Sequence, residues 1–100
     1  LKSIYLISAK FPTEEKFGLV SQIRRAAVSI PSNIAEGSGR ISKPDQRNFY
    51  KNAYSSLMEV LCQLLLSYDL EFIDEEELNK IRFQIDHVSR LLVGLYKSTE

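Results

Sequence analysis

The sequence predicts an all-α protein, an antiparallel up-down four-helix bundle with a truncated first helix. Along most of the chain, apolar residues recur at alternating intervals of three and four, which keeps one stripe facing a partner helix. Helix start and stop signals fall between these stretches. No segment alternates apolar and polar residues with a period of two, so we expect no sheet. The 100 residues suffice for one compact domain, and we expect residues 1–100 to form it.

Apolar stripes and breaking residues define the first two helices. The stripes are Ile4, Ile7 and Phe11 in the first helix, then Val20, Ile23, Ala27, Ile30 and Ile34 in the second. Pro12 is expected to end the first helix, because a residue before proline is pushed out of the helical conformation. Thr13 is expected to cap the second helix, with Glu14–Glu15 in its first turn. Gly37 and Gly39 are expected to end that helix with a left-handed C-cap.

The third and fourth helices have clear start signals. Their stripes are Tyr50, Tyr54, Leu57, Leu61, Leu64 and Tyr68, followed by Leu78, Ile81, Ile85, Val88, Leu92 and Leu95. The pairs Ser42–Asp45 and Asp74–Glu77 have the spacing of a helix cap, and Pro44 is tolerated in a first turn. The connection near Leu70–Ile73 is short, so these two helices are expected to be antiparallel neighbours.

The expected helix lengths are unequal. The last three helices should each run about 20 to 25 residues, or roughly 30 to 38 Å, whereas the first has only about ten residues. A half-length helix would leave apolar surface on its neighbours uncovered. We therefore expect the missing half of the first helix to precede Leu1.

Pro31 interrupts the second stripe between Ile30 and Ile34. A proline inside a helix removes one backbone hydrogen bond and clashes with the carbonyl four residues earlier, here that of Ala27. The helix can bend at Pro31 and continue, or stop near Ser29 and restart. Since the stripe keeps its phase across the proline, we predict a kinked but continuous helix.

Charge is balanced overall but unevenly distributed. Thirteen basic residues match thirteen acidic ones, so net charge does not indicate a nucleic acid or an anionic membrane as partner. Residues 1–51 hold nine Lys/Arg and four Asp/Glu, a net of +5, and residues 52–100 have the opposite balance, a net of −5. Such a polar molecule can meet its copies, or a partner, in a preferred orientation. Alternatively, the two halves neutralise each other within one fold.

Composition offers little support for an enzyme or a metal site. Cys62 is the only cysteine, so no internal disulfide can form, and a reducing cytoplasm fits best. His87 is the only histidine, and with Cys62 it cannot make a metal cluster. No apolar run approaches the roughly 20 residues of a membrane span. We expect no catalytic residues, no metal, no cofactor, no membrane and no small-molecule substrate.

Four segments together resemble a known family. They are "FGLVSQIRRAAVSIPSNIAEGSGR", "LLLSYDL", the acidic cap "DEEEL" and "LLVGLYKS". These segments resemble the bacterial four-helix-bundle proteins encoded within intervening sequences of 23S ribosomal RNA genes. The resemblance implies an antiparallel bundle with a longer first helix, assembled as a ring-like homopentamer. The chain is also similar to the accessory protein of diversity-generating retroelements, a basic pentamer implicated in binding RNA and a reverse transcriptase.

A basic set is the candidate nucleic-acid site. It comprises Arg24, Arg25, Arg40, Lys43 and Arg47, with Lys51 beside it. These side chains could contact the phosphates of RNA or DNA, which would make binding dependent on salt. Alternatively, they are solvated or paired with Glu36 and the acidic fourth helix.

Residues 31–37 carry a polar motif that we interpret as structural. Its members are Pro31, Asn33, Glu36 and Gly37. Asn33 and Glu36 could form a polar site at a helix end, but orienting that end or a subunit contact through hydrogen bonds is the preferred interpretation. "EGSGR" lacks the pattern of a phosphate-binding loop and follows a helix, so it is interpreted as a C-cap.

The expected function is therefore that of a non-enzymatic, cytoplasmic bundle protein that forms a homo-oligomer. Tyr50, Tyr54 and Tyr68 could stack on bases, although core or subunit contact is the favoured role at helical spacing. The alternative function is an RNA-binding module that uses the basic surface.

Overall fold

The computed structural model describes residues 2–100, and all regular structure in that range is helical. The elements are α1 (Lys2–Ser8), a 3₁₀ helix η1 (Thr13–Glu15), α2 (Leu19–Ser38), α3 (Lys43–Asp69) and α4 (Glu75–Lys97). The predicted all-α class and the short first helix are confirmed. α1 has seven residues, against 20, 27 and 23 in α2, α3 and α4.

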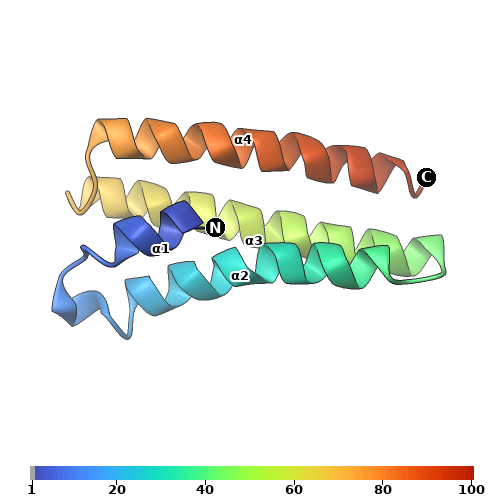
Figure 1. The fold of residues 1–100 in the computed structure, drawn as a ribbon, viewed down its shortest axis with the longest axis horizontal. Coiled ribbons are helices and arrows are strands. Elements are labelled where there is room, and N and C mark those ends of the chain that lie inside the picture. Colours follow the sequence, from blue (N-terminus) through green and yellow to red (C-terminus); the bar gives the residue numbers. More distant parts are fainter. Residues whose placement is uncertain (1) are drawn as a thin grey trace.

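The helices run up and down, with α3 in contact with both other long helices (Figure 1). α3 is about 40 Å long at 1.5 Å per residue, which accounts for most of the 44 Å long axis. α2 and α4 both pack on α3, but within residues 2–100 no Cα atom of α2 lies within 8 Å of one in α4. α1 contacts both α2 and α4 near the end where α4 begins. The fourth position of the bundle is therefore filled over only part of its length.

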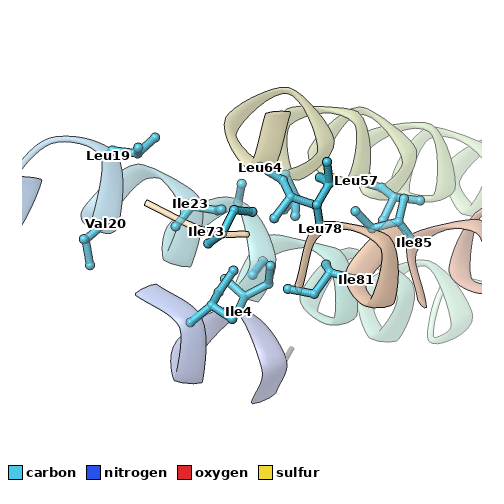
Figure 2. Close-up of a cluster of buried hydrophobic side chains, with 14 of the residues drawn as sticks. Ile4, Leu19, Val20, Ile23, Leu57, Leu64, Ile73, Leu78, Ile81 and Ile85 are labelled. Atoms are coloured by element: carbon cyan, nitrogen blue, oxygen red, sulfur yellow. The ribbon is translucent and has the colours of Figure 1, made fainter. Parts of the chain in front are cut away.

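The core draws on every helix (Figure 2). Four large apolar side chains are almost fully buried: Ile23, Leu57, Leu64 and Leu92. The stripes predicted for α1 and for the first half of α2 are buried, and so is most of the α4 stripe. Ile30 and Ile34 are only partly buried, because they lie beyond the region that α1 covers.

Both predicted start signals of the last two helices are confirmed. The side chain of Ser42 accepts a hydrogen bond from the backbone N–H of Asp45. Asp74 and Glu77 form a complete capping box, in which each side chain accepts from the backbone N–H of the other. In the turn between α3 and α4, Glu71 has a φ of 64°, and it is the left-handed residue of the described chain.

The signals around α1 and α2 were partly misread. α1 ends at Ser8, before Pro12, and Thr13 begins η1 and does not cap α2, whose N-cap residue is Gly18. The left-handed C-cap is wrong as well, because no glycine among residues 2–100 has a positive φ. Gly37 lies inside the last turn of α2, and the C-cap residue Gly39 has an ordinary φ of −86°.

α2 passes through Pro31 as one continuous helix, which confirms the predicted continuity, and the kink at Pro31 stays a prediction. Pro31 is exposed to solvent, so its ring lies on the surface of the helix. Because α2 is continuous, the polar residues after the proline belong to the same helix and lie beside α3.

The buried face of α3 differs from the predicted one. Its buried residues are Tyr50, Ala53, Leu57, Val60, Leu64 and Ser67. Tyr54 and Tyr68 are exposed, and Leu61 is only partly buried. The small residues Ala53 and Ser67 take core positions because α3 is contacted by two long neighbours, which approach it closely.

An ion pair links the turn after α1 to the first turn of α4. Lys10 donates a hydrogen bond to the Glu77 carboxylate, and this is the main reason why the pKa of Glu77 lies below its ordinary value of 4.5. The backbone N–H of Asp74 lowers this pKa further. A lowered pKa in the folded state means that the contribution to stability is complete above about pH 4.5 and is lost as the pH falls.

We expect Lys10→Met to raise the pKa of Glu77 towards 4.5, because the strongest of the groups that lower it is gone. The pKa is measured by following the Glu77 side-chain carboxyl carbon in an NMR titration. Lys16→Met, which removes a lysine of the neighbouring turn, serves as the control and should leave the Glu77 pKa unchanged. An unchanged Glu77 pKa in Lys10→Met would contradict this account.

Candidate functional site

Arg24, the first member of the basic set, is held against α1. Its Nε donates to the Ser8 hydroxyl at 2.8 Å, and a terminal nitrogen donates to the Tyr5 carbonyl at 3.2 Å. The guanidinium also lies 4.7 Å from the centre of the Tyr5 ring. Arg24 belongs to α2, and both of its acceptors lie in the last turn of α1. These hydrogen bonds therefore hold the short helix α1 against α2.

Three further basic residues gather where α2 turns into α3. Arg40 pairs with Glu36 at 3.2 Å and lies 4.8 Å from the centre of the Phe49 ring. Lys43 donates to the Ser98 carbonyl at 3.0 Å. Arg47 donates to the hydroxyl and the carbonyl of Thr99, at 3.2 and 2.7 Å. This end of the molecule is called the hairpin end below.

The basic set is thus divided between two places. Arg24 and Arg40 are 16 residues apart in or next to one helix, which corresponds to about 24 Å along its axis. Arg25 is exposed next to Arg24, but its side chain leaves α2 about 100° away. Arg40 and Lys43 flank the turn between α2 and α3, and Arg47 and the exposed Lys51 follow one and two turns further along α3.

The polar motif after Pro31 joins α2 to α3. The amide nitrogen of Asn33 donates to the carbonyl and the hydroxyl of Ser29, at 2.8 and 2.9 Å. The Ser56 hydroxyl of α3 donates to the same Ser29 hydroxyl at 2.8 Å. Asn33 therefore sits in an interhelical hydrogen-bond network, while Glu36 is exposed and contacts Arg40.

Gly37 marks the closest approach of α2 and α3. A Cβ atom at this position would lie 2.8 Å from Cε1 of Tyr50 and 2.9 Å from Cβ of Phe49. Tyr50 is buried there, and its hydroxyl lies 3.1 Å from that of Ser38. The close contact between α2 and α3, and not the backbone conformation, therefore favours glycine at position 37.

An open apolar groove continues beyond the N-terminus of α1. It has a volume of about 270 Å³ and lies between α2 and α4, with α3 as its floor. Its walls are Ile30, Pro31 and Ile34 on one side, and Ile81, Ile85, Val88 and Leu91 on the other. This is the uncovered apolar surface expected from a half-length first helix.

A second apolar surface lies on the outer face of α3. Met58, Leu61, Cys62, Leu65, Leu66 and Asp69 line a shallow depression there. Leu65 and Leu66 are 39% and 47% exposed. Sequence reasoning missed this surface, because the apolar residues of α3 were assigned to a single stripe although they cover more than one face of the helix.

Groups that could support catalysis or metal binding stay dispersed in the described chain. Cys62 and His87 are both exposed, and residues 2–100 contain no group of three His, Cys, Asp or Glu side chains arranged to hold a metal. None of the described helices is both long enough and apolar enough to cross a bilayer.

Comparison with protein families adds to this picture. The family model described as 23S rRNA-intervening sequence protein matches residues 1–94, which include α1, α2, α3 and most of α4. The chain belongs to the 23S rRNA-intervening sequence protein family. Membership confirms the resemblance noted in the sequence and fits the helical fold. A comparison with curated proteins gave no match for this family member.

Proposed function

We propose that this family member is a non-enzymatic bacterial protein of the cytoplasm that acts as a homo-oligomer, with five copies as the resemblance implies. The observation that carries the proposal is the amount of apolar surface outside the core. The outer face of α3 is apolar and accessible, whereas the groove between α2 and α4 is the surface that a longer first helix would cover. Contiguous apolar patches on a small domain are typical of association surfaces. The single exposed cysteine suits a reducing compartment.

Light scattering coupled to size-exclusion chromatography tests the assembly. One chain has a mass of 11.5 kDa, so a pentamer would give five times this value, about 58 kDa. The expected result is a particle of several chains whose mass holds on moderate dilution. A particle of 11.5 kDa at all concentrations would refute the homo-oligomer.

RNA binding at the hairpin end is the second candidate function. It is supported by the position of Arg40, Lys43, Arg47 and Lys51 on one end of the fold, with Lys43 and Lys51 exposed. The hydrogen bonds to Ser98 and Thr99 leave other donors of Lys43 and Arg47 for phosphate oxygens. The resemblance to the retroelement accessory protein, which is an expectation from the sequence alone, implies the same ligand class.

A salt titration of RNA affinity tests this candidate. We expect the double variant Lys43→Ala, Lys51→Ala to weaken binding and to lower the slope of log K against log salt by about two, one unit per lost phosphate contact. Lys80→Ala, Arg82→Ala is the matched control on α4 and should leave both quantities unchanged. Equal effects of the two double variants, or no binding at low salt, would contradict RNA binding at the hairpin end.

A further inference from the structure

The outer face of α3 carries a second set of residues at alternating intervals of four and three. The set is Lys51, Ser55, Met58, Cys62, Leu65 and Asp69. At 100° per residue these positions fall along one side of the helix, away from the buried face, and all are exposed except the half-buried Met58. The spacing is that of a two-helix seam. We call this set the α3 seam; it spans about 27 Å of helix.

The order of residues in the α3 seam is itself informative. It begins with a base, ends with an acid and is apolar from Met58 to Leu65. Neither Lys51 nor Asp69 forms an ion pair within residues 2–100. A parallel copy of the seam would place lysine beside lysine and aspartate beside aspartate, which is unfavourable.

An antiparallel copy of the seam pairs opposite charges at its two ends and Met58 with Cys62 near its centre. With the midpoint at Val60, Lys51 faces Asp69 of the second copy, Ser55 faces Leu65, and Met58 faces Cys62. Tyr54 and Leu66, which flank the seam on opposite sides, are 40% and 47% exposed. The twofold symmetry of such a contact repeats each of these pairs.

The charges at the two ends of the molecule favour the same orientation. The turn between α3 and α4 carries Asp69, Glu71 and the acidic run Asp74–Glu77, whereas the hairpin end is basic. The two ends lie at opposite ends of the long axis (Figure 1). Antiparallel alignment places the acidic turn of each copy beside the basic hairpin end of the other, so that the charges attract along the length of the contact.

We propose that the α3 seam is a docking surface for the α3 seam of a second copy of this chain, paired antiparallel about Val60. The proposal rests on the homo-oligomer proposed above and adds a contact to it, because the contacts within a five-membered ring are heterologous and not twofold. Because the contact is twofold, it joins single chains or whole rings in pairs. The contact area of one helix face is small, so the paired state should depend on protein concentration.

Charge exchange is the first test, with the mass measured by light scattering across a dilution series. Lys51→Asp places two aspartates opposite each other at both ends of the contact, and Asp69→Lys does the same with lysines. Each variant should raise the dissociation constant of the pair about tenfold or more. The double variant Lys51→Asp, Asp69→Lys restores opposite charges and should return to the wild-type value. Circular dichroism checks that each variant remains helical.

Cross-linking is the second test, because it reports the register. In the proposed pairing, the two Cys62 residues are offset by four positions, about 6 Å along the axis in addition to the helix separation of about 8–10 Å. That spacing is too long for a disulfide. Met58→Cys brings a thiol opposite Cys62 of the other copy, so mild oxidation should yield a covalent dimer. Adding Cys62→Ser should abolish it.

The possible outcomes separate the two proposals. A wild-type chain that stays monomeric at all concentrations contradicts both the homo-oligomer and the seam. A wild-type oligomer whose mass is indifferent to Lys51→Asp and to Asp69→Lys contradicts the seam alone. Oxidation that links wild-type chains through Cys62 as readily as Met58→Cys would overturn the antiparallel register.

Discussion

Leu92→Ala is expected to lower the free energy of unfolding by about 3 kcal/mol, within the range of about 2–5 kcal/mol found when a buried leucine is truncated. Leu92 is 1% exposed and belongs to the core on the C-terminal half of α4. With α1 covering only the other end, this half of α4 is held mainly by α3. The cavity left by the truncation therefore weakens the attachment of α4 over about half of its length.

The neighbouring leucine supplies the control for this change. Leu91 is 52% exposed, so Leu91→Ala removes little buried apolar surface. The free energy of unfolding should therefore fall by less than about 1 kcal/mol. Urea denaturation followed by circular dichroism measures both variants, at one protein concentration because association adds to stability. Similar losses for Leu91→Ala and Leu92→Ala would contradict the burial described for α4.

Gly37→Ala is expected to destabilise the fold by up to about 2 kcal/mol. Alanine is favoured over glycine in a helix by about 1 kcal/mol, but overpacking a tight contact costs about 1–3 kcal/mol. The new Cβ atom would lie within 3 Å of both Tyr50 and Phe49. Since Phe49 is approached at its own Cβ atom, which moves only with the backbone, we expect the unfavourable contact to outweigh the gain.

Gly94→Ala tests the same substitution without the contact. Gly94 lies in the interior of α4, and a Cβ atom there meets nothing within 4 Å. Its replacement should stabilise the protein by up to about 1 kcal/mol, as helix propensity predicts. The two changes are thus expected to have opposite signs in thermal or urea unfolding. A stabilising Gly37→Ala would show that α2 and α3 can separate slightly at no cost.

The fold could be predicted from sequence where local signals decide it. Stripes at intervals of three and four gave the helices, and the two caps at Ser42 and Asp74 were found because their partners lie three residues away. The start of α2 was missed because threonine is a common N-cap residue, whereas Thr13 begins a 3₁₀ helix in the structure. Gly37 was misread for a related reason: glycine signals a left-handed C-cap and a close helix contact equally well.

The candidate surfaces depend on contacts between distant residues and were harder to predict. That Arg47 would bind Thr99, 52 positions away, has no trace in local sequence. Nor could the sequence decide which apolar face of α3 is buried, since residues 50–69 are apolar on more than one side. In the structure, α2 and α4 pack against the face of α3 that carries the small residues Ala53 and Ser67.

The position of α1 at the edge of the bundle sets an order in which the molecule can open. In residues 2–8, α1 packs on α2 and α4 and has no Cα atom within 8 Å of α3. By contrast, both of those helices are supported by α3. Amide hydrogens of α1 should therefore exchange with solvent in a separate, cheaper step than those of the three long rods. Each time α1 detaches, the apolar groove between α2 and α4 would extend over nearly the full length of the bundle.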